Sequence, residues 1–191
     1  MYVMKVRKIN RLVLAVCAMS FAGSALAAEP EATLRYLDQD GASGFNAAIA
    51  IPATEHLSVE AMFGQVETDN ALNVAGVALG GITVKHKGIA VKYRHDFHEE
   101  LFVTSEVGYL DVSVSDESVG YVHGLIGVGS RIGDRFEYEF GVEHLNSRED
   151  MIKSETDAYY RIGLNFTSDF RVDFFHRAIE SQTGVGFVYN W

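Results

Sequence analysis

Residues 135–145 alternate strictly between apolar and polar side chains, and this pattern constrains the fold more than any other feature of the sequence. One face carries Phe136, Tyr138, Phe140 and Val142, and the other carries Glu137, Glu139, Gly141 and Glu143. A period of two indicates a β-strand, because successive strand side chains point to opposite faces and no helix has this period. The acidic face does not suit the core of a soluble protein, so the segment predicts a strand between an apolar and a polar environment.

The same alternation recurs along most of the chain, as expected for a protein built from many strands. It is clear in residues 45–51, 57–64, 89–94, 158–166 and 169–178, and looser in residues 101–109. Residues 82–87 are out of phase with residues 89–94, which predicts a β-bulge near Gly88. The two prolines and 18 glycines of the whole chain, with its many aromatic residues, fit long strands joined by tight turns.

The first 27 residues have the layout of a secretory signal peptide. Four basic residues up to Arg11 precede an apolar stretch at residues 12–22, and Ala25-Leu26-Ala27 forms a small-residue cleavage site. The apolar stretch is too short to cross a bilayer as a helix. We therefore expect a mature chain of residues 28–191 that forms one domain.

The mature chain has a composition that excludes several classes of protein. Its sequence contains no cysteine, because Cys17 lies in the signal peptide, so no disulfide is expected. The whole chain has a formal net charge of −10, and removal of the basic signal peptide makes it more acidic still, which argues against nucleic acid as a partner. No apolar run approaches the roughly 20 residues that a transmembrane helix needs.

The last nine residues form an alternating segment with an aromatic face. Val185, Phe187, Tyr189 and Trp191 share that face, and two glycines and Asn190 lie on the other. Such a strand packs either against lipid or inside a soluble β-sandwich, and the signal peptide favours lipid. This ending resembles the C-terminal signature of bacterial outer-membrane β-barrels, which implies that Phe187, Tyr189 and Trp191 form an assembly signal for periplasmic chaperones and the barrel assembly machinery.

The strands and turns together predict a closed antiparallel transmembrane β-barrel of ten strands. Short connections, expected to be periplasmic turns, lie at residues 52–56, 95–100, 133–134 and 167–169, and the extracellular loops are expected at 38–43, 68–81, 115–118, 146–156 and 180–182. An even count returns both termini to the periplasm and leaves no open sheet edge. Eight strands is the alternative, if residues 33–51 form one bent strand or an N-terminal extension.

The chain resembles the superfamily of small outer-membrane β-barrel proteins over essentially its whole mature length. Residues 91–97 (Val-Lys-Tyr-Arg-His-Asp-Phe) and 132–138 (Ile-Gly-Asp-Arg-Phe-Glu-Tyr) carry this likeness, and the layout is similar to that of YfaZ-like barrels. The resemblance implies a location in the outer membrane of a Gram-negative bacterium, in contact with its lipid and lipopolysaccharide. It implies no activity, because barrels of this size include adhesins, anchors, pores and enzymes.

No catalytic or metal site emerges from the sequence. His144 and Ser147 are a candidate pair for a lipid-modifying enzyme, but His144 shares the lipid-facing register of Phe140. Residues 95–100 hold metal-ligand side chains at close spacing, although a solvated turn has the same composition. We therefore expect a protein without catalysis, cofactor or metal.

The inward face predicts a lumen rich in opposite charges. The predicted charge network consists of Glu60, Glu106, Glu137, Glu139, Glu143, Arg161, Arg171, Asp173 and Arg177, with further bases at Arg35, Lys92, Arg94 and Arg131. Isolated buried charges cost several kcal/mol, so these groups should pair and hold the barrel together. This favours a structural or surface-interaction role, with a narrow pore for ions or small solutes as the alternative and a lipid-modifying enzyme as a distant third. The apolar loop at residues 68–81 is a candidate contact surface for an unidentified ligand.

Overall fold

The computed structural model describes residues 29–39, 41–68, 72–74, 77–79, 81–114, 117–147, 154–178 and 181–191. The ten strands of its main sheet are β1 (Glu31–Gln39), β2 (Ala42–Pro52), β3 (Leu57–Thr68), β6 (Thr83–His98), β7 (Leu101–Val114), β8 (Glu117–Ile132), β9 (Phe136–Ser147), β10 (Glu155–Asn165), β11 (Phe170–Arg177) and β12 (Gln182–Asn190). Two short strands, β4 (Leu72–Val74) and β5 (Val77–Leu79), form a separate hairpin between β3 and β6.

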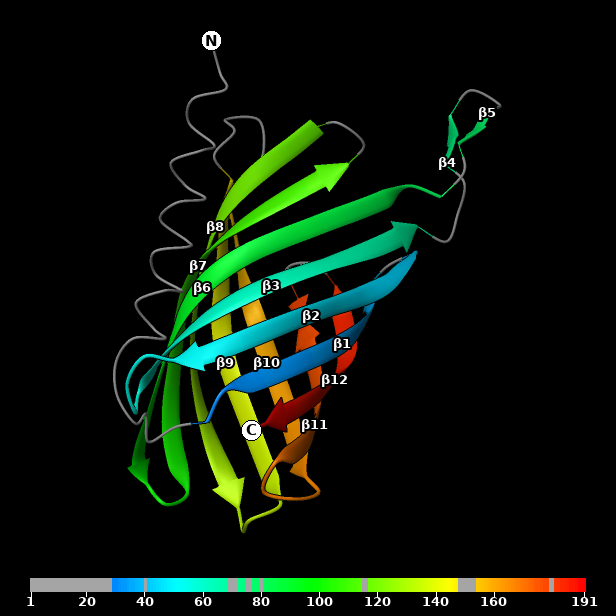
Figure 1. Ribbon diagram of the computed structural model, residues 1–191. Helices are drawn as coiled ribbons and strands as arrows, with labels where there is room; N and C mark the ends of the chain where they lie inside the picture. The colour runs from blue at the N-terminus through cyan, green and yellow to red at the C-terminus, as the bar shows by residue number, and fades with distance from the viewer. Residues whose placement is uncertain are drawn as a thin grey trace.

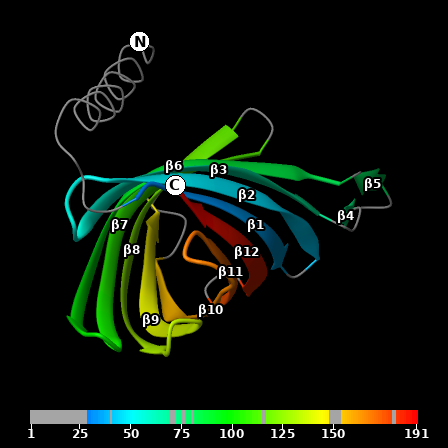
Figure 2. The ribbon, with the colours of Figure 1, turned by 60° about the horizontal axis from the view of Figure 1, so that its bottom comes forward.

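The ten strands close into one antiparallel barrel in the order β1-β12-β11-β10-β9-β8-β7-β6-β3-β2 (Figures 1 and 2). Closure is made by β12, which pairs with β11 on one side and with β1 on the other. The ten-strand prediction is therefore confirmed. The eight-strand alternative is wrong, because β1 and β2 are separate strands of a hairpin whose turn contains Gly41 at a φ of 71°, a value that favours glycine.

The barrel has two distinct ends. The turn end holds the short connections at residues 53–56, 99–100, 133–135 and 166–169, together with the start of β1 and the end of β12. Two of these turns share one device: the hydroxyl groups of Thr54 and Thr167 each accept a hydrogen bond of 3.0 Å from the backbone N–H three residues later. The other end, here called the loop end, holds the remaining connections.

Large apolar side chains cover the outside of the barrel. Phe63 and Val107 are each 64% exposed, and Phe140 is 57% exposed. Each belongs to the apolar face predicted from the alternation of its strand. So many exposed apolar side chains would be unstable in water but suit the hydrocarbon core of a bilayer. No helix in the described residues is long and apolar enough to cross a membrane.

One detail of the predicted register is wrong. Strand β6 continues through Gly88 without a bulge, with Gly88 opposite Met62 on β3 and Leu110 on β7. Its pairing with β7 shifts instead between Asp96 and His98, so β6 also runs into the segment that the sequence predicted as a turn. The apparent phase change arises because Lys85 and Lys87 lie on the same outward face as Ile89, nearer the loop end, where an outer surface can be polar.

The rim at the loop end is uneven. Strands β6 and β8 have 16 residues each and β7 has 14, whereas β11 has eight. In Figure 1 the β7–β8 hairpin rises above its neighbours, and the β4–β5 hairpin lies to the side of the barrel. The side chains of residues 69–80 lie outside the described residues, so the expected contact surface on this loop stays a prediction.

Candidate functional site in the barrel lumen

Arg161 on β10 lies at the centre of an ion-pair cluster inside the barrel. Its guanidinium group donates to Glu139 at 2.9 and 3.1 Å, to Asp173 at 3.2 Å, and also to Glu137. The strand register brings these groups together, because Glu139 on β9 lies directly opposite Arg161. Fork-shaped contacts from arginine to carboxylates are among the strongest hydrogen bonds in proteins.

The cluster extends towards the turn end on both sides of Arg161. Arg94 on β6 donates to both oxygens of Glu137, at 3.2 and 2.8 Å, and its guanidinium lies 3.8 Å from the centre of the Phe102 ring. On the opposite side, Arg171 donates to Asp173 at 2.7 Å. The complete set, here called the Arg161 network, is Glu31, Arg94, Asp96, Arg131, Glu137, Glu139, Arg161, Arg171 and Asp173.

Glu139 also accepts hydrogen bonds from two hydroxyl groups, those of Thr104 on β7 and Tyr159 on β10. A glycine makes room for this contact, since a Cβ at Gly127 would lie 2.8 Å from the carboxylate of Glu139. Four residues that contact this network were not predicted from the sequence: Glu31, Asp96, Thr104 and Tyr159. Tyr159 was detectable, because it precedes Arg161 by two residues and therefore shares its face.

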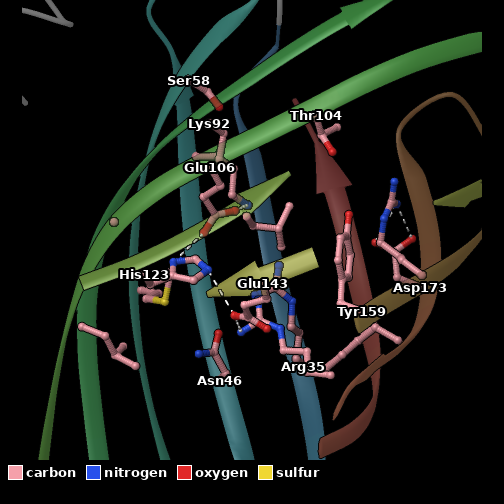
Figure 3. A pocket seen from close by; sticks show the side chains of 18 of the residues that line it. Arg35, Asn46, Ser58, Lys92, Thr104, Glu106, His123, Glu143, Tyr159 and Asp173 are labelled. Atoms are coloured by element: carbon pink, nitrogen blue, oxygen red, sulfur yellow. Dashed lines mark hydrogen bonds and ion pairs between the residues drawn. The ribbon is translucent and has the colours of Figure 1, made fainter. Parts of the chain in front are cut away.

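A second chain of charges crosses the lumen nearer its middle (Figure 3). Lys92 on β6 lies 2.5 Å from Glu60 and 3.8 Å from Glu106. His123 lies between two acids, with Nδ1 3.5 Å from Glu106 and Nε2 3.2 Å from Glu143. Arg177 ends the chain, 3.4 Å from Glu143. These six residues are here called the Lys92 network.

The structure places all nine predicted charge-network residues in the lumen and divides them between the two networks. Glu143 belongs to the second network and does not contact Arg161; it contacts His123 and Arg177. The reason is register: Glu143 lies opposite Asp157 on β10, two pairs away from the Glu139–Arg161 pair.

The inward face of β2 carries mostly small side chains, whereas that of β3 includes Glu60, Met62 and Val66. Ala42, Gly44, Ala48 and Ala50 form this β2 surface, here called the small-residue wall. Ala42 and Ala50 line a cavity of about 700 Å³. The lining of the cavity includes Glu31, Pro52 and Asn190 at the turn end, and Gln39, Thr68 and Gln182 at the loop end. The lining also includes Arg161, Arg171 and Asp173, so the cavity extends along the barrel and is bounded by both the small-residue wall and the Arg161 network.

Other candidate residues lie outside the lumen. His144 faces outward, with Nδ1 2.6 Å from the hydroxyl of Thr156. Within the described residues, no three His, Cys, Asp or Glu side chains are grouped so as to hold a metal ion. The predicted assembly residues Phe187, Tyr189 and Trp191 are each about half exposed, and the rings of Tyr189 and Trp191 are stacked 6.3 Å apart. The predicted signal peptide lies outside the described residues, so its cleavage stays a prediction.

Comparison with known proteins supports the fold. No family model matches the sequence, and no curated protein matches it. A solved structure described as a KdgM porin is similar with a TM-score of 0.50 and 9% identity, over 84% of this chain and 99% of that one. An outer membrane channel from Pseudomonas putida F1 matches with a TM-score of 0.47 and 10% identity, over 88% of this chain and 97% of that one. The Yersinia pestis outer membrane protein Ail matches with a TM-score of 0.45 and 12% identity, over 86% of this chain and 99% of that one.

At these identities the KdgM porin shares a fold with this chain and nothing finer. The closed ten-strand sheet and its apolar outer surface agree with the location that the sequence predicts, the bacterial outer membrane. The YfaZ-like layout finds no match among these structures and stays a resemblance. The chain is an outer-membrane β-barrel protein.

Proposed function

We propose that the protein is a narrow channel for water and small solutes, without catalysis. One observation carries this proposal: the cavity beside the small-residue wall is lined by residues from both ends of the barrel. A plugged barrel would have bulky side chains on every wall, as the small barrels whose lumens are filled do. Here the small side chains of Ala42 and Ala50 line the cavity opposite Arg161 and Asp173 of the Arg161 network.

The paired charges of the lumen support a channel that discriminates weakly between cations and anions. Most lumen acids contact a lumen base, as Glu60 contacts Lys92 and Asp173 contacts Arg171. Paired charges cancel at short range, whereas strongly selective pores present rings of one sign. The description of a similar structure as a porin agrees with this function but does not establish it.

The structural or surface-interaction role is the second candidate, and the two charge networks favour it. They connect strands that lie far apart in the sequence, such as β6 with β9 and β7 with β9. Such contacts stabilise a barrel whether or not it conducts.

Conductance across a planar bilayer tests the channel. The wild type should give stable single-channel steps, and Ala50→Trp, which places a large ring in the cavity, should lower the conductance by roughly half or more. Ala61→Trp is the matched control, because Ala61 faces outward on the neighbouring strand and should leave conductance unchanged. A folded wild type that never conducts would overturn the channel and leave the structural role.

A further inference from the structure

The lumen changes chemistry along its length. Towards the loop end the cavity lining includes several apolar side chains, Leu37, Val66, Leu110, Leu125 and Leu145, among polar ones such as Gln39, His86 and Gln182. Leu37 and Val66 pack with Ala42 and Phe175 in a buried cluster. These apolar side chains can contact the hydrocarbon part of a ligand, which a passage for ions alone does not need.

A cation lies directly beside this apolar zone. Arg35 on β1 faces the cavity two residues before Leu37, and its guanidinium lies 5.9 Å from the centre of the Phe175 ring. Within the described part of the chain, Arg35 is the one lumen base without an ion pair. The neighbouring acids already contact other bases: Glu60 contacts Lys92, and Asp173 contacts Arg161 and Arg171.

An unsatisfied amide lies next to Arg35. Asn46 is opposite Arg35 in the β1–β2 pairing, is 7% exposed, and lines the cavity. Its Nδ2 lies 2.8 Å from His86 Nε2, and its Oδ1 has no hydrogen-bond partner. Because His86 can either donate or accept, the amide can turn over and direct its NH₂ group into the cavity. Asn46 then supplies a second donor beside the Arg35 guanidinium.

We propose that this part of the lumen binds a linear monocarboxylate with an alkyl chain. The carboxylate accepts from Arg35 and Asn46, and the chain lies along Leu37, Val66, Leu110 and Leu125 towards the loop end. Arginine matches the planar geometry of a carboxylate, and apolar side chains with a few placed polar groups are the usual lining of a small-molecule site. The inference names the substrate class of the proposed channel and rests on that function.

Calorimetry on the protein in phospholipid nanodiscs tests the site, with protein-free nanodiscs as the reference. Sodium octanoate should bind, whereas octyltrimethylammonium, which has the same chain and the opposite charge, should not. From hexanoate to decanoate the affinity should rise roughly fourfold per methylene, as expected for an alkyl chain that leaves water. Equal binding of the two headgroups, or no dependence on chain length, would overturn the proposal. Both comparisons use the wild type, so they remain decisive should a variant fold poorly.

Two arginine variants locate the headgroup. Arg35→Gln should weaken octanoate binding by about tenfold or more, because a charge-assisted contact is lost. Arg135→Gln removes the same charge from the exposed turn at residues 133–135 and should leave binding unchanged. Unchanged octanoate affinity in a folded Arg35→Gln variant would overturn the site. Octanoate binding without conductance would support the site and overturn the channel. Conductance without octanoate binding would support the channel and overturn the site.

Discussion

The two sides of the lumen have the same strand geometry but carry different side chains. On β9, β10 and β11 many inward side chains are long and charged, and Arg161 connects Glu137, Glu139 and Asp173 into one ion-pair cluster. On β2 the small-residue wall contributes Ala42 and Ala50 to the lining of the cavity. The difference teaches that charge and volume are separable in a barrel: one wall supplies the contacts that hold the interior together, and the other supplies the space.

Strand β12 is the seam between these two walls. It pairs with β11 of the charged side and with β1, which leads into the small-residue wall. The comparison therefore predicts that changes at the seam affect the whole barrel, changes in the charged wall affect stability, and loss of long contacts in the Lys92 network affects little.

The largest effect is expected from deletion of residues 187–191. The deletion removes half of the β1–β12 pairing, and an unpaired strand edge cannot remain in hydrocarbon. The truncated chain should be absent from the outer-membrane fraction and lack the gel-mobility shift between unheated and boiled samples. Deletion of residues 72–79, which belong to the separate β4–β5 sheet, is the control. Normal outer-membrane levels of the truncated chain would contradict the role of the seam.

A smaller but still large effect is expected from Arg161→Gln. The substitution leaves Glu137, Glu139 and Asp173 without their shared cation, so the free energy of unfolding should fall by about 3–5 kcal/mol. Urea unfolding in lipid vesicles, followed by gel mobility, measures the change, with Arg135→Gln as the control for loss of an exposed charge. An Arg161→Gln barrel as stable as the wild type would show that the charged wall is not what holds the lumen together.

The smallest effect is expected from Glu106→Gln. Lys92 keeps its 2.5 Å contact with Glu60, and the two contacts that Glu106 loses are long, 3.8 Å to Lys92 and 3.5 Å to His123. The same unfolding assay should show a change below about 1 kcal/mol. A loss as large as that of Arg161→Gln would mean that the Lys92 network carries as much stability as the Arg161 network.

Much of the fold follows from alternation within single strands. Phe140 and Glu139 are assigned to opposite faces by their positions alone, and the structure agrees. Prediction fails where the outer surface is polar: Lys85 and Lys87 point outward on a continuous strand, and their charge mimics the phase change that a bulge at Gly88 would produce. The alternation of apolar and polar residues shows which environment each strand face contacts. Near the loop end the outer face of a strand no longer needs to be apolar.

The site was predictable in composition but not in pairing. Arg161 and Glu139 could be assigned to adjacent strands, and they do meet. The contact between Glu143 and Arg177 could not be predicted. Nor could the position of His123 between Glu106 and Glu143. Those contacts depend on the register of each strand against the next, and single-strand alternation does not contain that register.

The sequence by itself determined which side chains face inward, because strand direction alternates with a period of two that is local to the chain. It also determined closure, through an even set of strands whose apolar faces need lipid. Only the tertiary structure decided that Arg35 lies beside Phe175 without an ion pair, and that one cavity is lined by residues from both ends of the barrel. Contacts across the lumen depend on the tilt and stagger of the strands in the closed barrel, a property of all ten strands together.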